Sequence, residues 1–345
     1  LCFYNFISQK KSTKKSTKEV PISVVICAKN ESENLKSLLP SILQQAYSTF
    51  EIVLINDCST DDTLEVMETF KSKYSNVRIV NVMRNEAFWG SKKYALTLGI
   101  KSASHEHLVF TDADCKAKSK YWIREISSCF SDDRSIVLGY GKYASKQTFV
   151  NLLIRFETLL TGLQYMTYAK LGAPYMGVGR NLAYRKSEFF KTKGFSSHMD
   201  VASGDDDLFI QEAATKTNTT YTIATDSFTI SEPPVSYKAW FRQKRRHVAT
   251  SSYYKSKHKF FLGLFFLSKV MFYFLALVLC FFNWKLATPI VLLYFSSFWT
   301  IFGLSAKKLE EKNLIVYMPL LEVLLLLFQF SIFITNIFSK PTHWK

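Results

Sequence analysis

Four groups of charged residues in this sequence could act together in catalysis. Three are acidic, namely Asp57, the pair Asp112 and Asp114, and residues 205–207, while the fourth is the basic segment 243–247. Closely spaced carboxylates supply the hard oxygen ligands that divalent cations prefer, and Arg suits bidentate contact with phosphate. The set therefore predicts an enzyme that handles a nucleotide-activated, phosphate-bearing substrate.

Asp112 and Asp114 give the sharpest of these signals. They follow the apolar run 108–111, so they stand at the end of a predicted strand, where both side chains can turn toward one cation. Without a cation, two carboxylates this close repel each other, and one tends to become protonated. A Mg²⁺ or Mn²⁺ ion bridged to a diphosphate relieves that repulsion and neutralises the leaving group.

Each of the other groups allows a second interpretation. Asp57 could contact a nucleobase or a ribose, but it could also cap a turn. Residues 205–207 head a predicted helix at 207–215, where the helix dipole favours acidic caps. Because three consecutive Asp residues exceed what a cap needs, one is a candidate general base. Gln243 and Arg246 share a helical face, which suits either a phosphate or anionic lipid beside a membrane.

The elements that must position these residues alternate along the chain. Strand-type runs lie at 22–27, 50–55, 77–82 and 107–111, and stretches of helical spacing lie at 30–45, 63–74 and 92–103. This alternation predicts a mostly parallel sheet, whose strand ends meet at one edge. Open α/β sheets bind nucleotides at that edge. Residues 151–171 are amphipathic and fit either a core helix or a helix on a bilayer surface.

The last third of the chain is largely apolar. Segments 260–282, 286–306 and 314–338 are each long enough to cross a hydrocarbon core of about 30 Å. Only Lys269 and Glu322 are ionisable within them, and these two could snorkel or pair. Three crossings would leave the tail far from the soluble part, which the positive-inside tendency disfavours. Either one segment is re-entrant or interfacial, or the tail is translocated.

Charge and cysteine content narrow the class further. The formal net charge is +16, and the basic clusters flank the apolar segments, which favours a cytoplasmic membrane face over a nucleic-acid partner. The six cysteines form no CxxC or CxxH pair, so we expect neither a zinc site nor a disulfide framework but a reducing compartment. Residues 1–7 are apolar and could be the end of an N-terminal span.

In their order and spacing, these motifs resemble the family 2 glycosyltransferases with the GT-A fold, especially the membrane-integrated, inverting members. The resemblance covers roughly residues 20 to 250. It is carried by the opening strand and its Asn-Glu turn at 21–31, the second strand at 54–61, the Gly-Lys element at 90–96, the DxD motif at 112–114, the Gly-Glu-Asp-like station at 204–208, and the QxxRW-like station at 243–247.

The resemblance implies an α/β fold of the GT-A type, a Rossmann-like and mostly parallel sheet with flanking helices, followed by C-terminal transmembrane helices. The implied divisions are a membrane-proximal segment or linker at 1–19, the GT-A domain at 20–235, an interfacial basic helix at 236–259, the membrane region at 260–338, and a polar tail at 339–345.

The resemblance also implies roles for individual residues. Asp206 aligns with the catalytic base, which would take a proton from an acceptor hydroxyl as its oxygen attacks the donor's anomeric carbon opposite the leaving diphosphate; Asp205 stands beside it. Asp114, with Asp112, would hold Mg²⁺ or Mn²⁺. The nucleotide-sugar donor would be bound by Ala28, Asn30, Glu31, Asp57, Lys92, Asp112, Gln243 and Arg246.

Two positions depart from the family pattern. Asn56 replaces the first Asp of the second-strand pair, and His247 replaces the Trp of QxxRW. In processive relatives that Trp helps to form the acceptor site, so its absence favours transfer of one or a few sugars. The alternatives are a processive polysaccharide synthase of the same family, a non-catalytic membrane scaffold, and a transporter.

The implied partners are a nucleotide-sugar donor, a lipid-linked or saccharide acceptor, and membrane lipids. We expect no nucleic-acid partner. The implied location is the bacterial inner membrane, with the catalytic domain on the cytoplasmic face. The sequence indicates neither the sugar and its nucleotide nor the oligomeric state.

Overall fold

The computed structural model describes residues 19–83, 92–201 and 203–339. These residues group into two compact units. The α/β unit comprises residues 19–144 and 168–233, and the helical unit comprises residues 145–167 and 234–339. Outside the described residues lie positions 1–18 of the predicted N-terminal segment 1–19, Gly90 and Ser91 of the Gly-Lys element, and positions 340–345 of the predicted tail 339–345.

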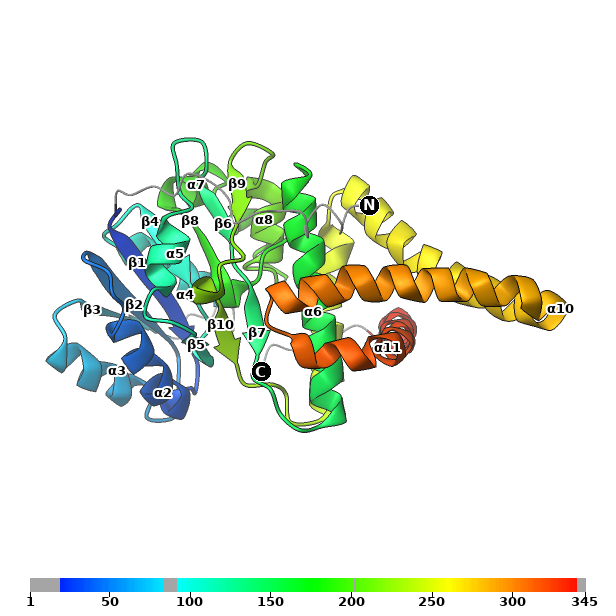
Figure 1. The fold of residues 1–345 in the computed structure, drawn as a ribbon. Helices are drawn as coiled ribbons and strands as arrows, with labels where there is room; N and C mark the ends of the chain where they lie inside the picture. The colour runs from blue at the N-terminus through cyan, green and yellow to red at the C-terminus, as the bar shows by residue number, and fades with distance from the viewer. Residues whose placement is uncertain (1–18, 84–91, 202, 340–345) are drawn as a thin grey trace. The chain divides into compact units, whose positions relative to one another are not determined.

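The α/β unit is built on a seven-stranded sheet (Figure 1). In spatial order its strands are β3 (Val77–Val82), β2 (Phe50–Asp57), β1 (Ile22–Ala28), β4 (His107–Phe110), β8 (Leu182–Arg185), β6 (Ile136–Leu138) and β9 (Thr219–Tyr221). Strands β1 to β4 are parallel, and β8 runs antiparallel to both of its neighbours. The predicted mostly parallel sheet is therefore confirmed.

Helices cover both faces of this sheet because successive side chains of a strand point to opposite faces. Val24 and Ile26 of β1 belong to a core shared with α2, α3 and α5. On the other face lies α4, where a Cβ on Gly99 would come within 2.1 Å of Ile55. The helices of this unit are α2 (Ser32–Leu43), α3 (Thr63–Lys73), α4 (Lys92–Ser102), α5 (Trp122–Ser127), α7 (Lys186–Lys191) and α8 (Asp207–Ala213).

A second, three-stranded sheet holds the segment that follows Asp114. Its central strand β10 (Thr229–Ser231) runs antiparallel to β5 (Cys115–Ala117) and parallel to β7 (Gly141–Tyr143). Because β5 begins directly after Asp114, the pairing of β5 with β10 fixes the backbone at the carboxyl end of the DxD motif.

The helical unit contains α9 (Tyr237–Ala249), α10 (Ser256–Lys308), the short 3₁₀ segment η6 (Lys312–Tyr317) and α11 (Met318–Phe338). Helix α6 (Phe149–Lys170) begins in this unit. Most of α6 is buried, so segment 151–171 is a core helix rather than a helix on a bilayer surface. Helices α10 and η6–α11 are long and apolar enough to cross a membrane.

Helix α10 is a hairpin of two antiparallel limbs. The backbone of Asn283 leaves the helical region, with φ −155° and ψ 81°. The rings of Phe272 and Tyr294, one on each side of this break, stack with centroids 3.9 Å apart. A continuous helix would separate them by about 33 Å at 1.5 Å per residue. Figure 1 shows the yellow limb and the returning orange limb.

Candidate active site

The turns after β1 and β2 are locked together by hydrogen bonds. Asn30, in the left-handed region at φ 55°, accepts a bond from the Thr60 N–H at 2.8 Å, and its own N–H donates to Ser59 Oγ at 3.0 Å. The Glu31 N–H donates to Thr63 Oγ1 at 2.8 Å. Asn30 and Glu31 therefore stand at the same sheet edge as the end of β2.

Asn56 explains one departure from the family pattern. Its amide nitrogen donates to Asn81 Oδ1 at 2.8 Å, and its Oδ1 accepts from the Ser59 N–H at 3.2 Å. A carboxylate could not donate the first of these bonds. Asp57, next in the chain, is buried, and this burial raises its pKa, although Lys29 and Lys92 act in the opposite direction.

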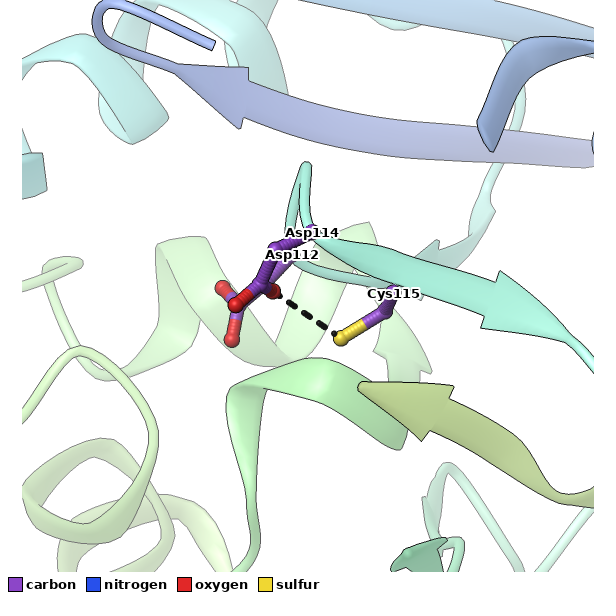
Figure 2. Close-up of side chains that lie close together, drawn as sticks. All are labelled: Asp112, Asp114 and Cys115. Atoms are coloured by element: carbon purple, nitrogen blue, oxygen red, sulfur yellow. Dashed lines mark hydrogen bonds between the residues drawn. The ribbon is translucent and has the colours of Figure 1, made fainter. Parts of the chain in front are cut away.

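Asp112 and Asp114 lie together where the chain leaves β4, with Cys115 beside them (Figure 2). One ligand atom from each of the three residues falls within 4.8 Å of the others. Asp112 is half-buried, Asp114 is exposed and Cys115 is buried. Loss of hydration, followed by the charge of Asp112, raises the pKa of Asp114. The two carboxylates are thus a pair of like charges on one side of the DxD turn.

A hard divalent cation fits this pair. Carboxylate oxygens are the donors that Mg²⁺ and Mn²⁺ prefer, whereas the soft sulfur of Cys115 is not. Burial, then the charges of Asp114 and Asp112, raises the pKa of the Cys115 thiol well above its usual value. The thiol lies 2.9 Å from Ser231 Oγ, and its raised pKa keeps it protonated. Asp112 and Asp114 therefore stay the candidate ligands.

Lys92 contacts both the DxD motif and the acidic segment 205–207. Its Nζ lies 3.1 Å from Asp112 Oδ1 and 2.9 Å from Asp205 Oδ2. Burial alone would lower the pKa of Lys92, but Asp112 and Asp205 raise it well above its usual value. Burial would likewise raise the pKa of Asp205, and Lys92 lowers it. Lys92 is therefore a fixed positive charge between two carboxylates.

Asp206 is held in a different way, by backbone N–H groups. Its Oδ2 accepts from the Gly179 N–H at 2.7 Å, and its Oδ1 accepts from the Asp207 N–H at 2.8 Å as the N-cap of α8. Burial, followed by the charges of Asp205 and Asp207, raises the pKa of Asp206 to about 8. Asp206 is thus a carboxyl group that changes protonation near neutral pH.

A small pocket at the carboxyl ends of β1 and β4 joins these groups. Its lining comes from β1, α4, β4 and β8 and from the segments that follow β4 and precede β8 and α8. The polar lining residues include Cys27, Lys92, Thr111, Asp112, Asp205 and Asp206. The predicted donor-site residue Lys92, the predicted metal ligand Asp112 and the predicted base Asp206 therefore share one cavity. Asp57, the last residue of β2, and Asp114 of the DxD turn are not among the residues that line this cavity.

Gln243 and Arg246 belong to α9 of the helical unit. Gln243 and Arg246 are half-buried, and His247 is exposed. The role of Gln243 and Arg246 at the donor diphosphate stays a prediction.

Sequence reasoning missed the loop that holds Asp206. The carbonyl of Arg180 accepts from Thr111 Oγ1 at 3.2 Å and from Thr229 Oγ1 at 2.9 Å, which fixes the loop carrying the Gly179 N–H. The Arg180 guanidinium lies 4.4 Å from the ring centroid of Tyr143, and its charge partly opposes the rise in the pKa of Asp114. The only signal was the close spacing of glycines at 177 and 179, which marks a tight turn.

Lys93 was also missed. Its side chain is buried, and its Nζ donates to the carbonyls of His198 and Val201 at 2.5 and 2.9 Å. Burial lowers the pKa of Lys93 to about 8. These bonds hold α4 to the chain just before Gly204. Gly204 has a φ of 99°, in the left-handed region, and directly precedes the acidic residues 205–207. Lys93 therefore orients the segment that carries Asp205 and Asp206.

The family comparison agrees with this geometry. The family model described as glycosyl transferase family 2 matches residues 23–192, which include β1 to β4, Lys92 and the DxD motif. The chain carries a family 2 glycosyltransferase domain. The resemblance drawn from the sequence is confirmed over residues 23–192, and so is the expected GT-A fold.

Individual curated relatives match only part of this chain. The chain is 31% identical to a cholesterol galactosyltransferase of Borreliella burgdorferi, over 46% of this chain and 45% of that protein. It is 38% identical to a poly-beta-1,6-N-acetyl-D-glucosamine synthase of Staphylococcus epidermidis, over 27% of this chain and 21% of that protein. The chain spans less than half the length of the curated relatives it matches.

Among solved structures, the chain is similar to a mannosyltransferase of Pyrobaculum calidifontis in complex with GDP-Man and Mn²⁺. The TM-score is 0.57 at 17% identity, covering 71% of this chain and 67% of that one. At this identity the likeness establishes the GT-A fold and nothing finer.

Proposed function

We propose that this glycosyltransferase is membrane-bound and inverting. It moves a sugar from a nucleotide-diphosphate sugar to a hydroxyl of a lipid-linked or membrane-proximal acceptor, with Mg²⁺ or Mn²⁺ as cofactor. The observation that carries the proposal is the pocket shared by Lys92, Asp112 and Asp206. It combines a fixed cationic group, a cation-binding carboxylate and a carboxyl group that can accept a proton.

The donor diphosphate would lie beside the DxD motif. A divalent cation held by Asp112 and Asp114 would neutralise charge on the leaving diphosphate. Lys92 adds a second positive charge in the same pocket, at 3.1 Å from Asp112. The nucleoside would occupy the edge formed by Ala28, Asn30 and their neighbours, where open α/β sheets bind nucleotides.

Asp206 would act as the general base. Because Lys92 balances the charge of Asp205 at 2.9 Å, Asp206 is the less stabilised of the two carboxylates and holds a proton more tightly. It would take the proton of the acceptor hydroxyl as that oxygen attacks the anomeric carbon opposite the diphosphate, so the configuration inverts. The Gly179 N–H fixes the direction of its Oδ2.

Two observations bear on the chemical class of the acceptor. One relative is named for cholesterol, an apolar molecule with one hydroxyl, and this chain has exposed apolar helices. Both favour a membrane-embedded acceptor. A processive polysaccharide synthase is the second candidate, because another relative carries that name, but His247 in place of the motif Trp favours short transfer.

The test is a donor screen with the purified full chain. We expect one class among UDP-, GDP- and dTDP-sugars to be consumed, and only with Mg²⁺ or Mn²⁺ present. Mass spectrometry of the products with membrane lipids as acceptors separates addition of one sugar from polymer synthesis. If calorimetry detects binding of none of these donors in the presence of the cation, the proposal is wrong.

A further inference from the structure

The contacts of α11 within the helical unit indicate whether the third apolar segment crosses a bilayer. The first half of α11 packs against the middle of the α10 hairpin. Glu322 of α11 accepts hydrogen bonds from Tyr273 Oη at 3.0 Å and Tyr294 Oη at 2.8 Å, one from each limb. It also pairs with Lys269 Nζ at 2.7 Å.

The second half of α11 packs against α9, which precedes the hairpin. The ring of Phe328 stacks on Trp240 with centroids 3.8 Å apart and planes 4° apart. Asn336 Oδ1 accepts from Arg245 Nε at 2.8 Å, and the same guanidinium donates to the carbonyl of Ser339. The end of α11 therefore lies beside the helix from which the chain enters the hairpin.

A third crossing would have produced different neighbours. From Met318 to Asn336 a helix rises about 27 Å at 1.5 Å per residue. If α11 ran alongside the limbs, Asn336 would lie near the hairpin turn at Asn283, but it contacts Arg245 of α9 instead. In Figure 1 the red end of α11 is seen nearly end-on, whereas both limbs of α10 lie lengthwise.

The exposed surfaces of α11 and α9 suit the boundary of a bilayer. One face of α11 is buried through Leu321, Leu325 and Ile332, and the opposite face exposes large apolar side chains, with Leu327 61% and Ile337 64% exposed. Apolar side chains on the free face of such a helix are placed against acyl chains. On α9, Lys238 and Arg242 are exposed, and such cations suit lipid headgroups.

We propose that α11 does not cross the bilayer. Among the described helices only the α10 hairpin enters it and returns, while α11 lies along the side of entry with its free apolar face in lipid. Ser339 and α9 then share one side of the membrane. This inference rests on the membrane attachment included in the proposed function, but it adds a specific topology that the attachment alone does not fix.

The test uses the full chain in sealed vesicles of either orientation, with single added thiols and a membrane-impermeant maleimide. Ser339→Cys reports the end of α11, and Ser252→Cys, exposed between α9 and the hairpin, is the matched reference. Mass spectrometry of the labelled peptides resolves each site, so no native cysteine is removed. Thermal unfolding checks that both variants fold as the parent does.

We expect both thiols to be labelled in the same vesicle orientation and protected in the other. Labelling of Ser339→Cys only from the side opposite to Ser252→Cys, or from neither side, overturns the proposal. Failure of the attachment itself gives a different result, because an alkaline carbonate wash would then release the unlabelled parent protein from the vesicles.

Discussion

Asp206 combines two opposing influences in one side chain. Two backbone N–H groups favour its charged form, while burial and the flanking carboxylates of Asp205 and Asp207 oppose it. The second influence is larger, so the pKa rises to about 8. A general base works best when its pKa is close to the working pH, and the balance of these contacts produces that match.

The raised pKa of Asp206 predicts opposite pH trends for rate and stability. We expect kcat to rise about tenfold per pH unit below about pH 8, because only the ionised form accepts a proton. The folded state binds a proton that the unfolded chain has released, so this group lowers the free energy of unfolding as the pH rises from about 4 to about 8. A kcat profile and urea unfolding across this range measure both trends; a flat kcat profile contradicts the assignment.

Substitution of Asp206 separates chemistry from binding. Asp206→Asn should lower kcat by about 10²–10⁴-fold, the usual contribution of a general base, with donor affinity nearly unchanged. It should also raise the free energy of unfolding above about pH 8, since a buried charge is removed. Asp207→Asn, one residue further into α8, is the control. Normal transfer by Asp206→Asn would show that another group is the base.

Substitution of Asp114 tests the cation site. Asp114→Asn should weaken Mn²⁺ binding by at least about tenfold, because a hard cation loses a charged ligand. It should also remove the repulsion between the two carboxylates of the DxD motif. Electron paramagnetic resonance of free Mn²⁺ gives the affinity, and exposed Asp132→Asn is the matched control. Equal affinities in the two variants would place the ion elsewhere.

The sequence predicted the pocket residues that carry charge at the end of a strand or helix. Asp112 and Asp206 follow such signals, and the structure places both beside Lys92. The spacing of Gly177 and Gly179 indicated a tight turn, but it could not predict that the Gly179 N–H donates to Asp206. Lys93 could not be predicted either, since the resemblance implies a role for Lys92 alone and the different partners of the two lysines depend on how α4 packs.

Among the elements, α4 links the pocket to the acidic segment 205–207 through its first two residues. Lys92 contacts the two carboxylates, and Lys93 holds the carbonyls of His198 and Val201. Elsewhere, long-range polar pairs connect the helices of the helical unit. Such pairs involve residues far apart in the chain, so periodicity predicted the helices but could not predict their partners.

The most buried of these pairs joins α6 to the segment after α10. Arg155 Nε donates to Glu311 at 2.9 Å, and Arg155 also donates to Asn313 at 2.7 Å. We expect Arg155→Met to lower the free energy of unfolding by about 3–5 kcal/mol, because it leaves a buried charge uncompensated. The double variant Arg155→Met with Glu311→Leu should recover most of that loss. Thermal unfolding in detergent measures both.

A partly exposed pair is the control for this prediction. Arg124 lies 3.5 Å from Glu19, and both side chains keep substantial contact with solvent. Arg124→Met should therefore cost no more than about 1 kcal/mol. Equal losses for Arg124→Met and Arg155→Met would show that burial does not determine the strength of the Arg155 pair.

At the scale of the whole molecule, exposed apolar surface is concentrated in one stretch. Along the α10 hairpin, Phe274 is 58% exposed and Leu293 is 70% exposed, and the turn exposes Phe281 and Phe282 at 83% and 86%. Exposed apolar surface of this extent marks a contact with membrane or protein. The apolar segments could be predicted from the sequence, whereas the turn at Asn283 and the path of α11 could not, because both depend on contacts between distant residues.

The exposed apolar surface of the α10 hairpin predicts that the protein resists extraction from a membrane by salt or alkali. We expect it to stay in the membrane pellet after washes with about 1 M salt and with carbonate at about pH 11, because apolar burial in lipid does not depend on ionic strength. Immunoblots of pellet and supernatant measure the partition. Release by salt alone would indicate that only the basic residues hold the protein to lipid.

The reversed direction of β8 has a consequence for how specificity could change. Parallel strands finish at the catalytic edge, but an antiparallel strand starts there, so the loop that precedes β8 reaches the pocket and delivers the Gly179 N–H to Asp206. The connection that leaves β8 lies at the opposite rim. Variation in length or sequence of the loop before Leu182 can therefore reshape this pocket, whereas variation in the turn from β8 into α7 changes the opposite rim.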